Sequence, residues 1–345
     1  GVLDPIRGSL EENGFPCTLF EKIAGEPDLA IAHELADWAR REPFRAVLGV
    51  GGGSAMDMAK LAAAFAVNSG RVEDYSGAVA FENSPLPLAL VPTTAGTGSE
   101  ATSVSMFSIE GKKSIILSPQ LVPLLAILDP LLTRSLPANM TAATGLDALS
   151  HALEAAMSTR AGPYTDLHVH KTCQLVASHL KTVYHDGTQL ASRRAMLFAA
   201  HCGGVCLNAG VVLGHSVAYT ISNRTNLPHG TCCAMSLPFV IAYNSAAVHK
   251  RLAALAGEAI GLPDADQRGL VLWSSTLTAD LGIPLSLREA GLSEDDLDAM
   301  IAECLKRYPR PNNPVPLEER RLSDMYRAFL EGDPLGYYDR VVRQS

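Results

Sequence analysis

Apolar residues near the start of the chain recur at helical spacing. This spacing predicts a helix from Asp4 to Asn13, which Gly14 ends, and an amphipathic helix from Asp28 to Arg41. Between the two, the residues from Cys17 to Phe20 predict a short strand. Helices that alternate with strands favour an α/β architecture for this part of the chain.

Two apolar runs then end in glycine-rich turns. Residues 45–50 are small and branched, as in a strand buried on both faces, and a helix over 54–67 follows the glycines at 51–53. The run from Leu88 to Val91 repeats the pattern and leads into a loop rich in threonine and glycine. A further pair of strands is expected between residues 105 and 117. These elements predict a mostly parallel, Rossmann-like sheet.

The pattern changes after the apolar segment from Leu124 to Pro130. Strand-like runs disappear, and helical segments rich in alanine, leucine and histidine continue to the end of the chain. A chain of 345 residues exceeds the ~250–300 residues that one core usually supports, so two domains are expected. We place an α/β domain at residues 1–136 and an all-α domain at residues 137–345.

Composition and charge exclude several classes of protein. The chain is 47% hydrophobic and 19% charged, which predicts packed cores rather than disorder. Its net charge of −8 and the lack of a Lys/Arg run argue against a nucleic-acid partner. Seven irregularly spaced cysteines are expected to be reduced thiols. With no signal peptide and no apolar run near the ~18 residues of a membrane span, we expect a cytoplasmic protein without membrane contact.

The glycines after the first buried strand predict an anion-binding turn. Gly51, Gly52 and Gly53 permit backbone conformations that other residues avoid, and Ser54 is expected to cap the following helix. Free N–H groups at the positive end of a helix suit a pyrophosphate. The alternative is a simple tight connection, since the segment is not a standard G-x-G-x-x-G motif.

The loop after the second buried strand carries a dense set of hydroxyl groups. Thr93, Thr94, Thr97 and Ser99 alternate with glycines at the expected carboxyl edge of the sheet. Open α/β sheets bind their ligands at this edge. The segment therefore favours a ligand-binding loop over an ordinary polar one.

Four side chains in the helical part could share one metal ion. Asp147 and His151 are four residues apart, so both lie on one face of a helix. His215 is followed fourteen positions later by His229, which Pro228 and Gly230 place at a turn. Four N/O donors suit Zn(II) or Fe(II). Taken singly, each histidine is more often a satisfied core or cap residue, so the prediction depends on the set.

Four segments together resemble a known family. GGGSAMDMAK, VPTTAGTGSEAT, GLDALSHALEA and LGHSVAYTISNRTNLPHG are similar, in order and spacing, to the iron-containing (group III) alcohol dehydrogenases of the dehydroquinate synthase-like superfamily. The resemblance covers nearly the whole chain. It implies an NAD(P)-binding α/β domain and a metal-binding helical domain, with Fe(II) or Zn(II) and NAD or NADP as cofactors.

The resemblance also assigns roles to residues. It places the metal ligands on Asp147, His151, His215 and His229, all of which are present. It places the pyrophosphate loop on Gly51 to Ser54, with Asp57 nearby. The nicotinamide and ribose contacts that it implies are Thr93, Thr94, Thr97 and Lys113.

Three departures from the family pattern stand out. Tyr219 occupies the position where a second histidine usually serves the proton path. A tyrosine can donate a proton but is a poor base near neutral pH, so the proton is expected to leave through Tyr219, the cofactor ribose or water. Cys233-Ala234 replaces the usual Asn-Ala, which is expected to reshape the pocket wall. The chain also begins inside the first helix of the pattern, without the strand and loop that select NAD or NADP.

The resemblance implies hydride transfer between NAD(P) and a small alcohol, aldehyde or ketone, with the metal as Lewis acid. One alternative is a metal-independent reductase similar to maleylacetate reductases. Another, from a different class, is a non-catalytic binding or structural relative. Large apolar helical faces in the second domain are compatible with a homodimer or a higher homo-oligomer.

Overall fold

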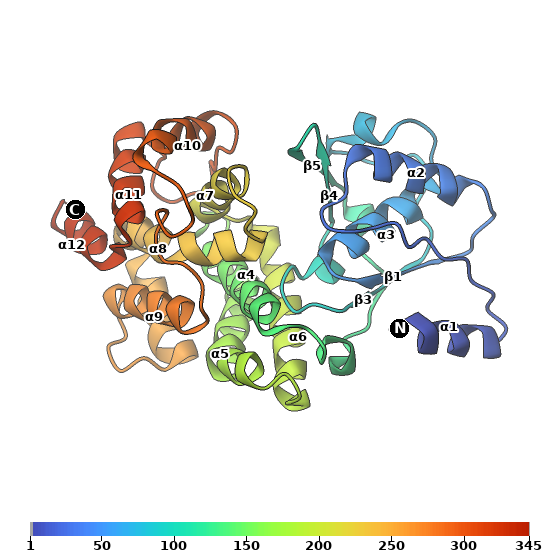
Figure 1. Cartoon of the computed structure of the whole chain (residues 1–345), viewed down its shortest axis with the longest axis horizontal. Coiled ribbons are helices and arrows are strands. Elements are labelled where there is room, and N and C mark those ends of the chain that lie inside the picture. The colour runs from blue at the N-terminus through green and yellow to red at the C-terminus, as the bar shows by residue number, and fades with distance from the viewer. Residues whose placement is uncertain (1–2, 345) are drawn as a thin grey trace. The chain divides into compact units, whose positions relative to one another are not determined.

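A computed structural model describes residues 3–344 and shows two compact units. One contains the chain up to Thr94 together with Gly98–Thr133, and the other contains Ala95–Thr97 together with the chain from Arg134 onward. The first unit holds all the strands of the described chain, and the second is helical (Figure 1). The predicted fold class, an α/β part followed by an all-α part, is confirmed.

The strands of the first unit form two small sheets. Their bounds are β1 Val47–Gly51, β2 Gly77–Ala78, β3 Leu88–Pro92, β4 Val104–Ile109, β5 Lys112–Leu117 and β6 Leu125–Ala126. One sheet has the order β1-β3-β6 and is parallel throughout, with Val47 opposite Leu88. The other has the order β2-β5-β4, and its β4–β5 pair is antiparallel, with Val104 opposite Leu117. The mostly parallel pairing agrees with the sequence pattern.

Three helices accompany these strands. They are α1 Leu3–Glu12, α2 Leu29–Arg40 and α3 Gly53–Phe65, and all three were expected from the spacing of apolar residues. Asp28 caps α2 because its side chain accepts a hydrogen bond from the Ile31 N–H. The expected strand at Cys17 to Phe20 is wrong, since this segment pairs with no strand among residues 3–344. Its Phe20 ring instead contacts Trp38 of α2, with ring centroids 5.5 Å apart.

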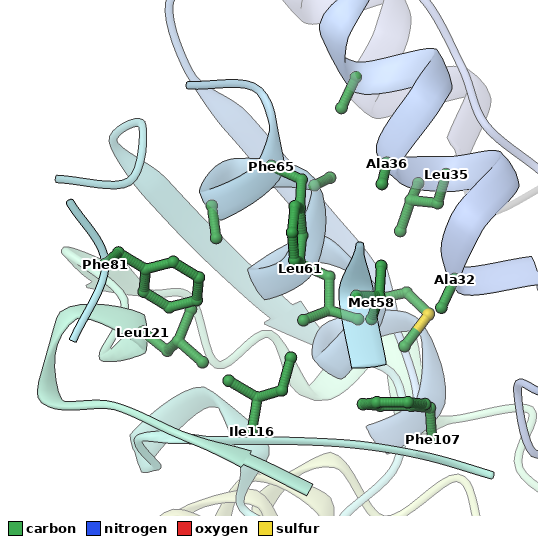
Figure 2. Packing of buried hydrophobic residues seen from close by; sticks show 14 residues of the cluster. Ala32, Leu35, Ala36, Met58, Leu61, Phe65, Phe81, Phe107, Ile116 and Leu121 are labelled. Atoms are coloured by element: carbon green, nitrogen blue, oxygen red, sulfur yellow. The ribbon is translucent and has the colours of Figure 1, made fainter. Parts of the chain in front are cut away.

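Helix α3 lies at the centre of the core of the first unit. Figure 2 shows its side chains between those of α2 and those of the neighbouring strand and loop segments. The labelled members of this cluster are Ala32, Leu35, Ala36, Met58, Leu61, Phe65, Phe81, Phe107, Ile116 and Leu121. Each large side chain contributes roughly 1.5–3 kcal/mol through burial. The core therefore fixes α3, and with it the turn that precedes the helix.

The second unit consists of nine long helices within the described residues. They are α4 Ala138–Met157, α5 Pro163–His185, α6 Leu190–Cys206, α7 Leu213–Ser222, α8 His229–Ala254, α9 Gln267–Asp280, α10 Glu294–Lys306, α11 Glu319–Glu331 and α12 Pro334–Gln344. Helix α4 is buried almost all round between Thr141 and Met157, so it forms the centre of this unit. It packs against α5, α6 and α8, and α8 packs against α7.

Short helical turns join these elements. The 3-10 turns are Val72–Tyr75, Ser99–Ala101, Pro119–Leu121, Pro130–Thr133 and Leu207–Ala209, and a π-helical turn, Leu255–Ile260, continues α8. By length and composition the segment His229–Ile260 could cross a membrane, and 83% of its most apolar window is buried within the protein. The pair Leu190–Ala209 and Leu213–Ser222 meets the same criteria only as one span, and it is bent by 108°.

Candidate metal centre and cofactor loop

Helix α4 places two of the predicted metal ligands side by side. Asp147 and His151 lie one turn apart, and the Nε2 atom of His151 is 3.7 Å from the Oδ1 atom of Asp147. Their residues are only 4% and 5% exposed. This is the arrangement that the four-residue spacing predicts, now on the most deeply buried helix of the unit.

The other two predicted ligands come from α7 and the first turn of α8. The His215 ring stacks on His151 with centroids 5.1 Å apart, and the His229 ring lies 5.3 Å from His215. Asp147, His215 and His229 form a group with Cys233 in which one donor atom from each residue lies within 4.8 Å of all the others. We call these four residues the donor cluster.

A close approach between two helices makes the donor cluster possible. His229 is the first residue of α8, and the helix reaches α4 at Gly230. A Cβ atom at Gly230 would lie 2.2 Å from the carbonyl oxygen of Ala143 and 3.1 Å from the Cβ of Asp147. Any larger residue would push the first turn of α8 away. Glycine at this position therefore sets the distance between Asp147 and His229.

A carboxylate that we did not predict holds His215 in place. Glu154 is 1% exposed, and its oxygens accept hydrogen bonds from His215 Nδ1 at 2.7 Å, the His215 N–H and the Val212 N–H. Because Nδ1 donates its proton to Glu154, the lone pair of His215 lies on Nε2, which faces the donor cluster. The sequence did carry a signal, since Glu154 follows Asp147 by seven residues and His151 by three on the same helix.

Two buried polar atoms test whether a metal fits here. Among the described residues, Asp147 Oδ1 and His151 Nδ1 have no hydrogen-bond partner. Burial alone raises the pKa of Asp147, but the nearby histidines, His151 first, lower it overall and favour the carboxylate. Burial lowers the pKa of His151, and the Asp147 carboxylate beside it opposes that shift. An ionised carboxylate buried among imidazoles suits a divalent cation, so the residues fit the metal that the sequence predicts.

Tyr219 lies against the donor cluster as a neighbour of His229. Its ring stacks on the His229 ring, with centroids 5.4 Å apart and an interplanar angle of 17°. Tyr308 contacts its ring, and the Arg310 guanidinium lies 5.9 Å from its centroid. Burial raises the pKa of Tyr219 to about 12. The phenol is therefore placed to donate a hydrogen bond but not to act as a base near neutral pH.

The turn between β1 and α3 in the first unit requires glycine. Gly51 has φ +151°, and a Cβ atom there would lie 2.6 Å from the Cβ of Ala55. Gly52 is the N-cap of α3, so Ser54 lies inside the first turn, and the expectation that Ser54 caps the helix is wrong. The glycines let the helix start early, which leaves the first N–H groups without intrahelical partners.

The threonine loop lies beside this turn. The Thr93 N–H donates to the carbonyl oxygen of Gly51 at 2.9 Å. A Cβ atom at Gly52 would lie 3.5 Å from the methyl group of Thr94, so both threonines adjoin the glycine turn. Thr97 belongs to the second unit. Lys113 lies in β5, where it forms an ion pair with Glu26 at 3.3 Å.

The contacts of Asp57, on α3, are those of a structural residue. Its carboxylate accepts hydrogen bonds from the Ser99 hydroxyl at 2.5 Å and the Met106 N–H at 3.0 Å, and it lies 3.5 Å from Lys60 Nζ. Lys60 is fully buried and also donates to Ser99 and Thr102. Burial raises the pKa of Asp57 and lowers that of Lys60. The pair thus ties α3 to the segment from Ser99 onward.

Comparison with known proteins gives consistent matches over both units. The model for iron-containing alcohol dehydrogenases matches residues 1–130, and that for the C-terminal part of the Fe-containing alcohol dehydrogenase family matches residues 141–330. Long-chain-alcohol dehydrogenase 1 of Geobacillus thermodenitrificans (strain NG80-2) is 34% identical over 342 residues, which cover 96% of this chain and 87% of the relative.

Solved structures resemble the chain equally well. A 1,3-propanediol oxidoreductase has a TM-score of 0.89 at 32% identity, and the match covers 95% of this chain and 88% of that one. A sulfoacetaldehyde reductase from Bifidobacterium kashiwanohense, solved in complex with NAD+, has a TM-score of 0.86 at 29% identity with the same coverage.

Proposed function

Because the chain belongs to the iron-containing alcohol dehydrogenase family, we propose that Asp147, His151, His215 and His229 bind its divalent metal. The protein is a metal-dependent oxidoreductase that acts on alcohols or aldehydes. The family supports iron, and the donor types also accept Zn(II). One observation carries the assignment: Asp147 Oδ1 is buried without a hydrogen-bond partner among the described residues, inside a group of imidazoles.

The residues around the proposed metal site have different roles. A bound divalent metal supplies Lewis acidity to an alcohol or carbonyl oxygen. Glu154 keeps His215 in the tautomer that presents Nε2, and Tyr219 stacks on His229 and holds its ring. With its raised pKa, Tyr219 offers a proton-donating hydroxyl beside the centre. We infer that it orders a water or a substrate oxygen rather than abstracting a proton.

For the cofactor we propose NAD or NADP in the first unit. The pyrophosphate would bind the N–H groups of Gly52, Gly53 and Ser54 at the start of α3, which suits an anion. Thr93 and Thr94 adjoin this turn and would contact the ribose and nicotinamide. We assign Thr97 and Lys113 to the same cofactor on the resemblance alone. Asp57 would support cofactor binding indirectly, because it anchors α3, the helix that follows the turn. The related sulfoacetaldehyde reductase in complex with NAD+ supports NAD.

The substrate that we propose is a small alcohol or its aldehyde. Relatives named for long-chain alcohols, methanol and 1,3-propanediol differ widely in the chain length of the substrate, so their names support the class of substrate and not its chain length. A metal-independent reductase of the maleylacetate type is disfavoured, because it would leave the Oδ1 atom of Asp147 buried without a hydrogen-bond partner among the described residues. A homo-oligomer in the cytoplasm remains our expectation.

Metal content provides the direct test. The purified protein should contain about one Fe or Zn per chain by elemental analysis, and His229→Ala and His151→Ala should lose both the metal and NAD(P)-linked alcohol oxidation. His168→Ala, a histidine whose Nδ1 bonds to the carbonyl oxygen of Tyr164, is the matched control and should keep both. A wild-type protein that turns over fully after its metal is removed would overturn the proposal.

A further inference from the structure

Cys233 lies one helical turn after His229 and faces the same point in the second unit. Its Sγ atom is 3.5 Å from His229 Nε2 and 3.9 Å from His215 Nε2. The side chain is fully buried, and Cys233 belongs to the donor cluster together with Asp147. The sequence pattern had indicated only a change in the pocket wall at this position.

These distances match those between ligands of one metal ion. In a tetrahedral zinc site, nitrogen and sulfur donors lie about 2.0–2.1 and about 2.3 Å from the ion, which places them about 3.6 Å from each other. The Sγ–Nε2 distances of 3.5 and 3.9 Å lie on either side of that value. The sulfur therefore needs little movement to share an ion with the two imidazoles.

A second, independent observation points to a ligand at the same place. The Oδ1 atom of Asp147, which is 4% exposed, has no hydrogen-bond partner among residues 3–344. Asp147 and Cys233 come from α4 and α8, whose close approach at Gly230 brings both side chains to one point. The Cys233 thiol donates a hydrogen bond to the Asp147 carboxylate but leaves its Oδ1 atom without a partner among the described residues, whereas a cation would satisfy sulfur, oxygen and nitrogen together.

The other cysteines lack this environment. All seven are free and lie in the described part of the chain. Cys304 contacts the Tyr326 hydroxyl at 3.1 Å, and Cys232 faces the carbonyl oxygen of Leu227 at 3.9 Å. Cys232 is as buried as Cys233 and adjacent to it, yet it does not belong to the donor cluster. It serves as a matched control for any effect of the sulfur.

We propose that Cys233 is a thiolate ligand of the metal in this chain, so that sulfur joins the proposed ligands Asp147, His151, His215 and His229 at the site. The inference rests on the proposed metal-binding function and deepens it. On binding, a metal–sulfur bond forms, the S–H bond breaks and the proton passes to solvent, without any change of oxidation state. A soft sulfur donor favours Zn(II) over Fe(II), so zinc is the metal that this site prefers.

Cobalt(II) substitution makes the sulfur visible without an activity assay. Chelated full-length protein, titrated with Co(II), should show a near-ultraviolet sulfur-to-cobalt charge-transfer band that saturates at about one ion per chain. Cys233→Asn and Cys233→Ser should bind Co(II) without this band, and Cys232→Ser should keep it. Metal titrations in two buffers should show that the Cys233 variants release one proton fewer per bound ion than the wild type does. The affinity of the Cys233 variants for Zn(II) should fall by about 10–100-fold or more. A fall of this size follows even the loss of a residue that only hydrogen-bonds to a metal ligand.

The outcomes separate the two proposals. Binding of Co(II) without the band in the wild type, or a band that survives in Cys233→Asn and Cys233→Ser, overturns the thiolate ligand and leaves the metal-binding function intact. In that case the contacts at 3.5 and 3.9 Å are packing contacts of a buried thiol, whose single proton can be donated to only one partner. A folded wild-type protein that binds neither Co(II) nor Zn(II) overturns both proposals.

Discussion

Each unit carries an acidic residue on a central helix, with a side chain that is 15% exposed at Asp57 and 5% exposed at Asp147, and the two residues differ in what surrounds them. Asp57 on α3 has a hydroxyl, a backbone N–H and the Lys60 ammonium beside it. Asp147 on α4 has imidazole rings on several sides and an oxygen with no hydrogen-bond partner among the described residues. The carboxylate of Asp57 has its hydrogen bonds satisfied within the fold, whereas that of Asp147 would be satisfied by the metal that we propose.

Removal of the unsatisfied carboxylate should have the largest effect on activity. Asp147→Asn should lose the metal and lower kcat/KM about a thousandfold or more, since Lewis-acid stabilisation amounts to several kcal/mol. The metal-free variant should unfold at a urea concentration similar to that of the metal-free wild type, because the Oδ1 atom of Asp147 makes no hydrogen bond that the substitution would remove. Lower stability of the metal-free variant would show that Asp147 holds the fold as Asp57 does.

Loss of the satisfied pair should affect stability instead. Lys60→Met removes the partner of Asp57 and the donor to the Val104 carbonyl oxygen, so the free energy of unfolding should fall by about 3–5 kcal/mol. Urea denaturation measures this change. Lys113→Met is the matched control: Glu26, its partner, is half exposed, and the loss should stay below about 1 kcal/mol. If both substitutions lowered the free energy of unfolding equally, the Lys60–Asp57 pair would contribute no more to stability than the exposed Lys113–Glu26 pair.

Glu154 extends the comparison between Asp57 and Asp147. Its hydrogen bonds are satisfied, as those of Asp57 are, but one of them positions the proposed metal ligand His215. Glu154→Gln keeps the size of the side chain but cannot accept from His215 Nδ1 and both backbone N–H groups at once. Metal affinity should fall about 10–100-fold, as measured by competition with a chromophoric chelator. The urea midpoint of the metal-free protein serves as control, and a drop in stability with unchanged metal affinity would make Glu154 a purely structural residue.

The smallest effect is expected at Tyr219. Burial raises the pKa of Tyr219 to about 12, so its hydroxyl stays protonated near neutral pH and cannot accept a proton. Tyr219→Phe, which retains the stack on His229, should therefore lower kcat by less than about tenfold. A general acid–base residue contributes about 10²–10⁴-fold. Steady-state kinetics decides between the two, with Tyr308→Phe as control for loss of a neighbouring hydroxyl. A hundredfold loss specific to Tyr219 would restore it as the proton relay.

The sequence predicted those parts of the site that depend on short spacings. Asp147 and His151 lie on one helix face, and the strand, glycine turn and helix around Gly51 follow from local pattern. It failed where the outcome depends on distant partners. No pattern near Cys17 shows that the segment has no strand to pair with, and the N-cap at Gly52 depends on a backbone conformation that Ser54 does not reveal.

Two residues of the candidate site were missed for a similar reason. Glu154 acts on a histidine 61 positions later in the chain, and its role appears only when α7 packs beside α4. Cys233 is one helical turn from His229, so its spacing was as informative as that of Asp147 and His151. A cysteine in an apolar helix is usually a small buried residue, and only the fold shows that this one faces two imidazoles.

Helix α8 begins with a proposed metal ligand and continues into the apolar centre of the second unit. Metal occupancy and folding are therefore thermodynamically linked: an ion that binds only the native state adds about 4 kcal/mol to the free energy of unfolding when its concentration is a thousand times the Kd. The protein that has lost its ion would spend more time unfolded, and unfolded chains are substrates for proteases. A cell short of metal would then lose not only the activity of this enzyme but the enzyme itself.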